Sequence, residues 1–214
     1  MVQGFGKRVS SIITLKKLVY LISPNKIENN FFSNLDKVLA AKNIEFFQLR
    51  LKKIRKNSFL RIARKIKKIT LKHKVKFIIN DNYNITAKIN ADGCHMGQLD
   101  GSIVYARKKL KNKILGITCH GSRTLVRNAL KDKADYIAFG SFFKSKLKPN
   151  AIKANLNILK WAKKEIKKPI VVIGGINNLN YKKLINAGAK YIAISSFIWD
   201  NPKLKPEFAI RKFK

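Results

Sequence analysis

The chain has 214 residues, of which 47 are Lys or Arg and 11 are Asp or Glu, so its net charge is +36. Cys94 and Cys119 belong to no CxxC motif and no His/Cys cluster, which argues against a disulfide framework or a zinc site and favours a reducing cytoplasm. No apolar run approaches the roughly 20 residues of a membrane span and the basic N-terminus has no signal-peptide pattern, so we expect no membrane partner.

Short apolar runs recur along the chain and predict eight β-strands. Most of the runs are continuous rather than alternating, which is typical of strands that are buried on both faces. The runs lie at 17–23, 44–51, 75–81, 93–97, 113–119, 135–143, 169–176 and 190–198. The segments between them space their apolar residues as helices do, although this pattern is weak at about 82–91.

This alternation predicts an α/β protein that folds as a single-domain (β/α)8 TIM barrel. A doubly wound open sheet normally has a Gly-rich turn after its first strand, and the segment YLISPNK, residues 20–26, has none. We expect one domain over residues 1–214, with a short basic N-terminal extension over about 1–16 and a basic C-terminal tail over about 201–214.

Polar residues gather where the predicted strands end. They are, in chain order, Gln48, Arg50, Lys52, Asn80, Asp81, His95, Gln98, Asp100, Thr118, His120, Ser145, Lys148, Gly174, Gly175, Ser195 and Ser196. Functional side chains of a TIM barrel lie at the C-terminal ends of its strands. We therefore expect these residues to meet over one rim of the barrel.

Asp81 and Asp100 follow neighbouring strands of the predicted barrel and indicate a Mg²⁺ site. Mg²⁺ prefers hard oxygen ligands, keeps several waters and completes its shell with substrate phosphates. Two unpaired buried carboxylates would be costly, and a bound cation supplies a reason for them. Each acid could instead be a helix N-cap, and this alternative stays open.

Cationic side chains lie near these acids in the predicted barrel. Gln48, Arg50 and Lys52 alternate along one strand, so their side chains share a face, and Lys148 would add another cation. This set suits a pyrophosphate that is held by a metal ion and by lysine. The alternative is that Arg50 and Lys52 form ordinary salt bridges to the acids.

Gly174 and Gly175 after the seventh strand, with Ser195 and Ser196 after the eighth, predict a phosphate site. Backbone N–H groups at such turns can hold phosphate, and phosphate sites after strands seven and eight recur in TIM barrels. His95 fits a structural role better than a catalytic one. His120 is equally compatible with catalysis and with a polar loop.

Several motifs together carry a resemblance to a known family. They are QLRLK (48–52), IND (79–81), GCHMGQLD (93–100), GITCH (116–120), FGSFFKSKLKP (139–149), VIGGI (172–176) and AISSF (193–197). The chain resembles the thiamine phosphate synthase family over nearly its whole length. The resemblance implies a TIM barrel that joins an aminopyrimidine pyrophosphate to a thiazole phosphate, with release of pyrophosphate and no enzyme nucleophile.

The resemblance also implies residue roles. Asp81 and Asp100 would bind Mg²⁺ as the cofactor. The pyrimidine pyrophosphate would be held by Gln48, Leu49, Arg50, Leu51, Lys52, Asn80, Thr118 and Lys148. The thiazole phosphate would be held by Ser145, Lys146, Leu147, Gly175, Ser195 and Ser196. Leu147 stands where the family usually has a hydroxyl donor, and Ser141 stands where Pro is usual.

Two alternatives to a synthase remain. A thiazole tautomerase-like isomerase shares the barrel and the phosphate site but usually lacks the intact ND and GQxD pair, which this chain keeps at 80–81 and 97–100. A non-catalytic barrel that binds polyanions would explain the net charge. The lysines, however, are spread along the whole chain and no RNA-binding or helix-turn-helix motif accompanies them, so we expect phosphorylated small molecules rather than nucleic acid as partners, with a homo-oligomer left open.

Overall fold

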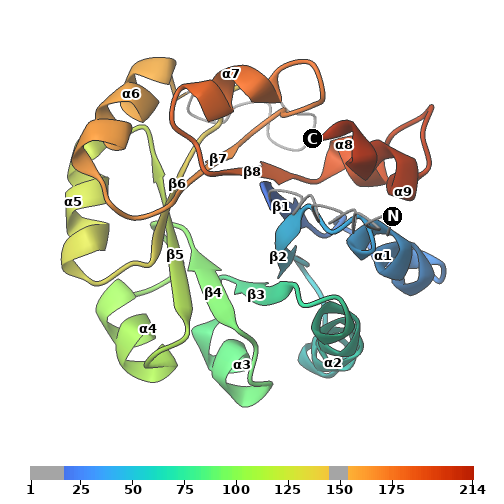
Figure 1. Ribbon diagram of the computed structural model, residues 1–214. Coiled ribbons are helices and arrows are strands. Elements are labelled where there is room, and N and C mark those ends of the chain that lie inside the picture. Colours follow the sequence, from blue (N-terminus) through green and yellow to red (C-terminus); the bar gives the residue numbers. More distant parts are fainter. Residues whose placement is uncertain (1–16, 145–153) are drawn as a thin grey trace, which may run out of the picture.

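The computed structural model describes residues 17–144 and 154–214. Eight parallel strands close into one barrel in sequence order, each hydrogen-bonded to the next and the eighth to the first (Figure 1). They are β1 (Val19–Ile22), β2 (Ile44–Leu49), β3 (Lys76–Asn80), β4 (Gly93–Met96), β5 (Ile114–His120), β6 (Tyr136–Phe139), β7 (Ile170–Ile173) and β8 (Tyr191–Ile194). The predicted fold class is confirmed.

Helices surround this barrel and cover its outer face (Figure 1). They are α1 (Phe31–Leu39), α2 (Lys56–Lys72), α3 (Tyr83–Lys88), α4 (Ile103–Leu110), α5 (Arg123–Lys131), α6 (Leu156–Glu165), α7 (Tyr181–Asn186), α8 (Ser196–Trp199) and α9 (Pro206–Ala209), followed by the 3₁₀ turn Ile210–Lys212. The weak pattern at about 82–91 corresponds to α3, only six residues long. Several predicted strands ran too far, because apolar residues of the following turns extend the apolar runs.

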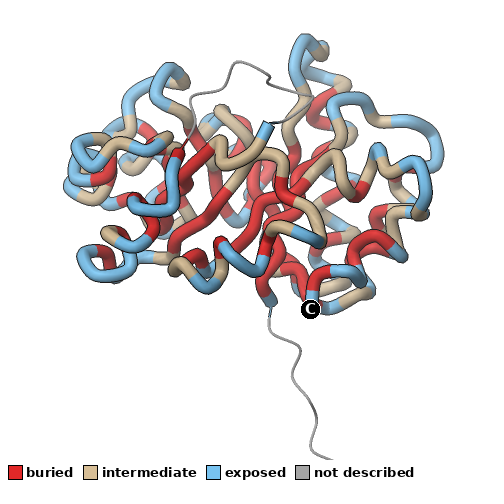
Figure 2. The backbone as a smooth tube through the Cα atoms, turned by 90° about the horizontal axis from the view of Figure 1, so that it is seen from above, coloured by how far each residue is buried: buried red, intermediate tan, exposed pale blue. Residues whose placement is uncertain are grey.

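The buried side chains form two layers that follow the period-two alternation of the strands. The outer layer lies between strands and helices, while an inner cluster fills the barrel with side chains such as Tyr20, Phe46, Ile78, Tyr136 and Val171. Figure 2 shows this arrangement as buried backbone in the centre and exposed backbone on the surrounding loops and helices. Because side chains fill the interior, any site must lie at a mouth of the barrel.

The C-terminal segment differs from its prediction as a basic tail. α9 and the 3₁₀ turn pack against the barrel, and Ala209, Ile210 and Phe213 are buried. The amide nitrogen Nδ2 of Asn43 donates to the carbonyl oxygens of Ile210 and Phe213, which ties this segment to the start of β2. The frequent basic residues in this segment made its three buried apolar residues difficult to recognise from the sequence.

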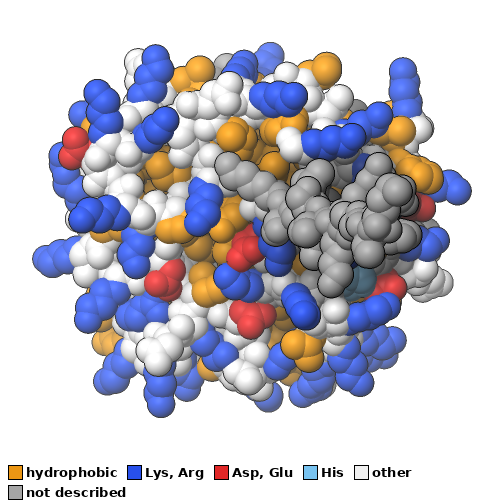
Figure 3. Space-filling view, viewed as in Figure 1, with side chains coloured by type: hydrophobic (Ala, Val, Ile, Leu, Met, Phe, Trp, Pro, Cys, Tyr) orange, Lys and Arg blue, Asp and Glu red, His pale blue; other side chains and the backbone are white. Residues whose placement is uncertain are grey.

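Lys and Arg side chains are spread over the whole visible face of the molecule rather than gathered into one patch (Figure 3). This distribution fits the expected solvated surface. Within 17–144 and 154–214, none of the helices has the length and the apolar character that crossing a bilayer requires.

Candidate active site

The two acids predicted to bind a metal lie together at the C-terminal rim of the barrel. Asp81 follows the last residue of β3, and Asp100 lies in the loop after β4. Burial raises the pKa of Asp81 to about 6, and the Asp100 carboxyl contributes to this rise through a hydrogen bond and through its charge. The charges of Arg50 and Lys52 act in the opposite direction. The two carboxyl groups are therefore close enough for Asp100 to raise the pKa of Asp81.

Neither acid is a helix N-cap. Asn82 caps α3 by accepting a hydrogen bond from Ile85 N at 2.8 Å, and Ser102 caps α4 by accepting one from Tyr105 N at 3.4 Å. Asp100 Oδ2 instead accepts from Gly97 N at 2.7 Å, which closes the loop after β4 and aims the carboxyl. The capping alternative is thus wrong for both acids.

Local backbone geometry explains how Asp81 reaches the rim. Its N–H donates to His95 O at 2.7 Å, which extends the β3–β4 ladder by one bond. Its φ is 62°, in the left-handed region that Asp tolerates better than most residues. The chain therefore turns at Asp81 and leaves its carboxyl beside Asp100 rather than in the sheet.

Arg50 and Lys52 lie beyond the end of β2, not within the strand as predicted, since the strand stops at Leu49. Arg50 is anchored by Ser23, whose Oγ accepts from Arg50 N at 3.0 Å, and its guanidinium donates weakly to Asn25 Oδ1 at 3.4 Å. Among the described residues, no Lys or Arg nitrogen lies within 4.0 Å of Asp81 or Asp100. The salt-bridge alternative is therefore not realised, and both cations stay available.

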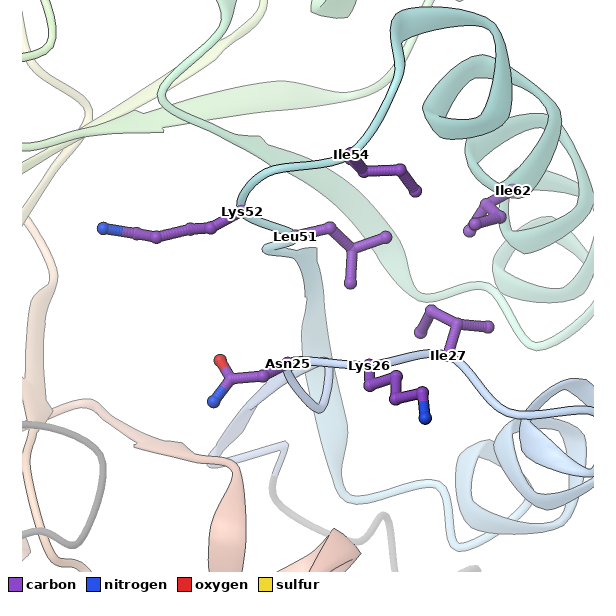
Figure 4. Close-up of a pocket in the computed structure, with 7 residues that line it drawn as sticks. All are labelled: Asn25, Lys26, Ile27, Leu51, Lys52, Ile54 and Ile62. Atoms are coloured by element: carbon purple, nitrogen blue, oxygen red, sulfur yellow. The ribbon is translucent and has the colours of Figure 1, made fainter.

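A small apolar pocket of about 220 Å³ lies behind Lys52. It is lined by Ile27, Leu51, Ile54 and Ile62, with Asn25 and Lys26 at its edge. Figure 4 shows Lys52 pointing away from these apolar side chains and Leu51 pointing toward them. Leu51 thus anchors this part of the loop, while the side chain of Lys52 extends away from the pocket and has no ion-pair partner within 17–144 and 154–214.

Leu49 and Leu51 offer their side chains to the core rather than to a ligand. Leu49 is fully buried in the outer apolar layer, and Leu51 packs against the same layer. Any contact of these two residues with a substrate would come from their backbone. Gln48, which precedes both leucines, points into the barrel interior and is 3% exposed.

A chain of hydrogen bonds crosses the barrel interior below the acids. Gln48 Nε2 contacts Tyr20 Oη at 2.8 Å, Tyr20 Oη contacts Tyr136 Oη at 2.8 Å, and Tyr136 Oη contacts His95 Nδ1 at 2.8 Å. His95 Nε2 then contacts Thr118 Oγ1 at 2.8 Å. Gln48, His95 and Thr118 were among the predicted rim residues, but neither tyrosine was. The alternation of inward and outward positions along β1 and β6 was the signal that could have found them.

The environment of His95 keeps its ring neutral. Burial lowers its pKa to about 4; the charge of Asp100 acts in the opposite direction, and the charge of Arg50 lowers the pKa further. The ring stacks on Tyr136, with centroids 5.6 Å apart and planes 12° apart. The predicted structural role of His95 agrees with these contacts.

Two further amide side chains lie at or near the C-terminal ends of β3 and β4. Asn80 is the last residue of β3, pairs with His95 in the sheet and is half-buried. Gln98 Nε2 donates to Thr118 O at 2.6 Å and so links the loop after β4 to β5. His120 ends β5 with a φ of 53°, and nothing described here gives it a chemical role.

The predicted phosphate turn follows β7. Gly174 and Gly175 have φ values of 106° and 60°, which favour glycine, and a Cβ on either would collide with Ser141 or Lys144. Asn180 Nδ2 donates to Gly175 O at 2.9 Å and holds the turn. Ser195 Oγ already donates to Ser23 O at 3.1 Å, and Ser196 begins α8.

Ser195 also lines a pocket of about 480 Å³ between the loop after β1 and the start of α8, together with Asn25, Lys26 and Trp199. The remaining predicted phosphate ligands, Ser145, Lys146 and Leu147, lie outside the described residues, as does the predicted pyrophosphate ligand Lys148. The phosphate site is therefore described only on its β7 and β8 sides.

The residues at the rim fit a magnesium ion. Two carboxyl groups meet there, and neither has an ion-pair partner within the described part of the chain. No group of three or more His, Cys, Asp or Glu suited to a metal occurs within residues 17–144 and 154–214. Two carboxylates with water and phosphate oxygens match the shell that Mg²⁺ prefers, whereas zinc would want more protein ligands.

Comparisons with known proteins agree with the barrel fold and with the family resemblance of the sequence. A family model described as thiamine monophosphate synthase matches residues 19–198. A Pelagibacter ubique (strain HTCC1062) protein named thiamine-phosphate synthase is 55% identical over 200 residues, covering 93% of this chain and 97% of that protein. One of the same name from Erythrobacter litoralis (strain HTCC2594) is 39% identical over 186 residues, covering 85% and 87%. The solved thiamine phosphate pyrophosphorylase from Pyrococcus furiosus matches with a TM-score of 0.81 and 25% identity over 93% of each chain.

Proposed function

This chain belongs to the thiamine monophosphate synthase family and has the activity of its relatives, and we propose that it forms thiamine phosphate with a Mg²⁺ ion held by Asp81 and Asp100. The reaction joins 4-amino-2-methyl-5-hydroxymethylpyrimidine pyrophosphate to a thiazole phosphate and releases pyrophosphate. The observation that supports the metal is the meeting of two carboxyl groups at the rim, close enough that one raises the pKa of the other.

The chemistry asks the protein to position two substrates and to stabilise a leaving group. The bond between the pyrimidine methylene carbon and the pyrophosphate oxygen breaks, and a bond from that carbon to the thiazole nitrogen forms. Mg²⁺, when bound, would neutralise charge on the departing pyrophosphate. Lys52 and Arg50, which lie beyond the end of β2, would stabilise the negative charge that develops on the pyrophosphate oxygens as this group leaves.

The two substrates are separated by the layout of the rim. Gln48, Asn80 and Thr118 provide polar groups for the pyrimidine over β2, β3 and β5. The Gly174–Gly175 turn and the Ser195–Ser196 step offer backbone N–H groups for the thiazole phosphate over β7 and β8. The methylene carbon and the thiazole nitrogen would meet between these two sets.

The same proposal covers location and partners. Cys94 and Cys119 are free and buried, and burial raises the pKa of each thiol to about 12. Such thiols are inert and suit a reducing cytoplasm, where both phosphorylated substrates would be soluble. The spread of positive charge would attract these anions without a nucleic-acid partner. The synthase name of the relatives favours the synthase over the tautomerase-like alternative.

The decisive experiment is incubation with both substrates and detection of thiamine phosphate by mass. We expect product with Mg²⁺, none after chelation with EDTA, and recovery when Mg²⁺ is restored. Asp81→Asn and Asp100→Asn should each lower kcat/KM by about 100-fold or more, because removing a preorganised charge-stabilising group costs that much.

Asp132→Asn is the matched control. Asp132 is the C-cap residue of α5 and precedes β6, so it lies near the N-terminal ends of the strands and not at the C-terminal rim. Its activity should equal that of the wild type. Calorimetry of pyrophosphate binding provides a readout apart from turnover, and Mg²⁺ should strengthen binding to the wild type but not to the Asp81→Asn variant. Full activity in EDTA, or in both Asp→Asn variants, would overturn the metal proposal.

A further inference from the structure

The interior hydrogen-bond chain has a single direction. The amide nitrogen of Gln48 can only donate, so Tyr20 Oη accepts from it. A phenol has one hydrogen, and the hydrogen of Tyr20 must therefore go to Tyr136 Oη, 2.8 Å away. The hydrogen of Tyr136 then goes to His95 Nδ1, and His95 Nε2–H donates to Thr118 Oγ1.

A reversed direction would leave a buried hydrogen without an acceptor. A His95 ring with a hydrogen on Nδ1, either as the other neutral tautomer or doubly protonated, would donate to Tyr136, and Tyr136 would then donate to Tyr20. Tyr20 would receive two hydrogens, from Gln48 and from Tyr136, and its own hydrogen would have no acceptor in the chain. Unpaired buried donors are costly, so one tautomer of His95, with its hydrogen on Nε2, satisfies every member.

The chain is also held rigidly. Tyr20, Tyr136 and Gln48 are 1%, 2% and 3% exposed. The Tyr136 ring lies in the space that a Cβ on Gly116 would occupy, so the glycine in β5 makes room for it. Tyr20 packs edge-on against Tyr136, with centroids 5.8 Å apart and planes 70° apart.

The two ends of the chain face the rim with opposite hydrogen-bonding character. Gln48 lies near the C-terminal end of β2, and Thr118 lies near the C-terminal end of β5. Gln48 gives one of its two Nε2 hydrogens to Tyr20, which leaves its carbonyl oxygen as an acceptor beside the second Nε2 hydrogen. Thr118 accepts from His95, which leaves its hydroxyl hydrogen as the donor.

We propose that Tyr20, Tyr136 and His95 are positioning residues that hold Gln48 as an acceptor and Thr118 as a donor, and that this fixed polarity selects the aminopyrimidine ring. A 4-aminopyrimidine offers an NH₂ donor and ring-nitrogen acceptors, which match the two ends. A 4-oxopyrimidine of the same shape offers an acceptor and a ring N–H, which oppose them. This inference rests on the proposed function, because it assumes that the pyrimidine binds over Gln48 and Thr118.

The test compares two substrates in three proteins. The substrates are the 4-aminopyrimidine pyrophosphate and its 4-oxo analogue, and the proteins are the wild type, Tyr20→Phe and the control Tyr191→Phe. Tyr191 also fills the barrel interior but takes no part in the chain. Tyr20→Phe removes one hydroxyl, so the Gln48 amide loses its partner and can turn over.

We expect Tyr20→Phe to raise the KM for the aminopyrimidine by about fivefold to tenfold, the effect of one net hydrogen bond, with a smaller change in kcat. The KM for the oxo analogue should fall or stay unchanged, so the preference for the aminopyrimidine over the oxo analogue should decrease. Tyr191→Phe should keep the wild-type preference. Equal preference in wild type and Tyr20→Phe would overturn the proposal.

A measurement on the wild type keeps the proposal testable if the variant does not fold. ¹⁵N NMR of His95 should show a neutral ring with its hydrogen on Nε2, and a hydrogen on Nδ1 or a doubly protonated ring at neutral pH would contradict the chain. The two proposals fail in different ways. A wild type that makes no thiamine phosphate contradicts the proposed function, while the His95 tautomer still reports on the chain by itself.

Discussion

The barrel interior and the rim above it treat polar groups in opposite ways. In the interior, Gln48, Tyr20, Tyr136, His95 and Thr118 form hydrogen bonds with one another, and only the two ends of this chain keep polar groups for a ligand. At the rim, the carboxyl groups of Asp81 and Asp100 lie near each other. Within the described residues, neither Arg50 nor Lys52 has a nitrogen within 4.0 Å of these carboxyl groups. The interior therefore has few polar groups left for a ligand, while the rim has the charged groups that the proposed metal ion and pyrophosphate would use.

The largest effect is expected at the rim. Arg50→Gln should weaken binding of the pyrimidine pyrophosphate by about 1.5–3 kcal/mol, or roughly 10-fold to 150-fold, because a charge-assisted hydrogen bond is lost. Isothermal titration calorimetry measures this. Arg61→Gln, on the exposed face of α2, is the control and should bind like the wild type. Equal affinity in Arg50→Gln and wild type would remove Arg50 from the site.

The interior should respond in stability instead. Gly116→Ala places a Cβ against the buried Tyr136 ring, and overpacking of this kind costs about 1–3 kcal/mol of the free energy of unfolding. Urea denaturation measures it. Gly121→Ala meets only ordinary contacts with Ala154, so its stability should stay within about 0.5 kcal/mol of the wild type. An unchanged stability in Gly116→Ala would show that the Tyr136 ring is free to move.

Metal affinity should depend on pH through Asp81. Its pKa is raised to about 6, and only the ionised carboxylate binds Mg²⁺. The ionised fraction falls about tenfold for each pH unit below the pKa, so apparent Mg²⁺ affinity should decline below pH 6 and level off above it. Activity as a function of Mg²⁺ at pH 5, 6, 7 and 8 would measure this. A decline that begins only near pH 4 would mean that Asp81 ionises as an ordinary, separate carboxyl.

The smallest effect concerns the metal-free protein. Because the pKa of Asp81 is higher in the folded than in the unfolded state, the folded state binds more protons between about pH 4 and 6, and stability falls as pH rises through that window. Asp81→Asn should remove this loss and raise the melting temperature at pH 7.5 by about 2–4 °C, which corresponds to about 1 kcal/mol in a domain of this size.

Differential scanning calorimetry in EDTA would measure the gain, and saturating Mg²⁺ with pyrophosphate should shrink it by stabilising the wild type alone. A variant that is both less active and less stable would assign Asp81 to the fold rather than to the rim chemistry.

Much of the barrel could be predicted from local patterns. The eight apolar runs and the helical spacing between them led to the TIM barrel, since buried parallel strands have continuous apolar runs. The placement of Asp81 and Asp100 at one rim followed from their positions after the third and fourth strands. The strand ends were predicted less well, because apolar residues in turns, such as Phe142 and Phe143, prolong a run that the hydrogen-bond ladder has already left.

The residue types at the rim could be recognised along the chain, because a motif such as IND or GCHMGQLD is local and keeps its order. The direction of the hydrogen-bond chain could not. Tyr20 and Tyr136 are separated by 116 positions, and their hydroxyl groups meet only because the closed barrel brings β1 and β6 across from each other. Capping was likewise settled by geometry, since Asn82 and Ser102, not the neighbouring acids, reach the free N–H groups. Local spacing determines which face a side chain occupies, while contacts across the barrel depend on closure, and closure is a property of all eight strands together.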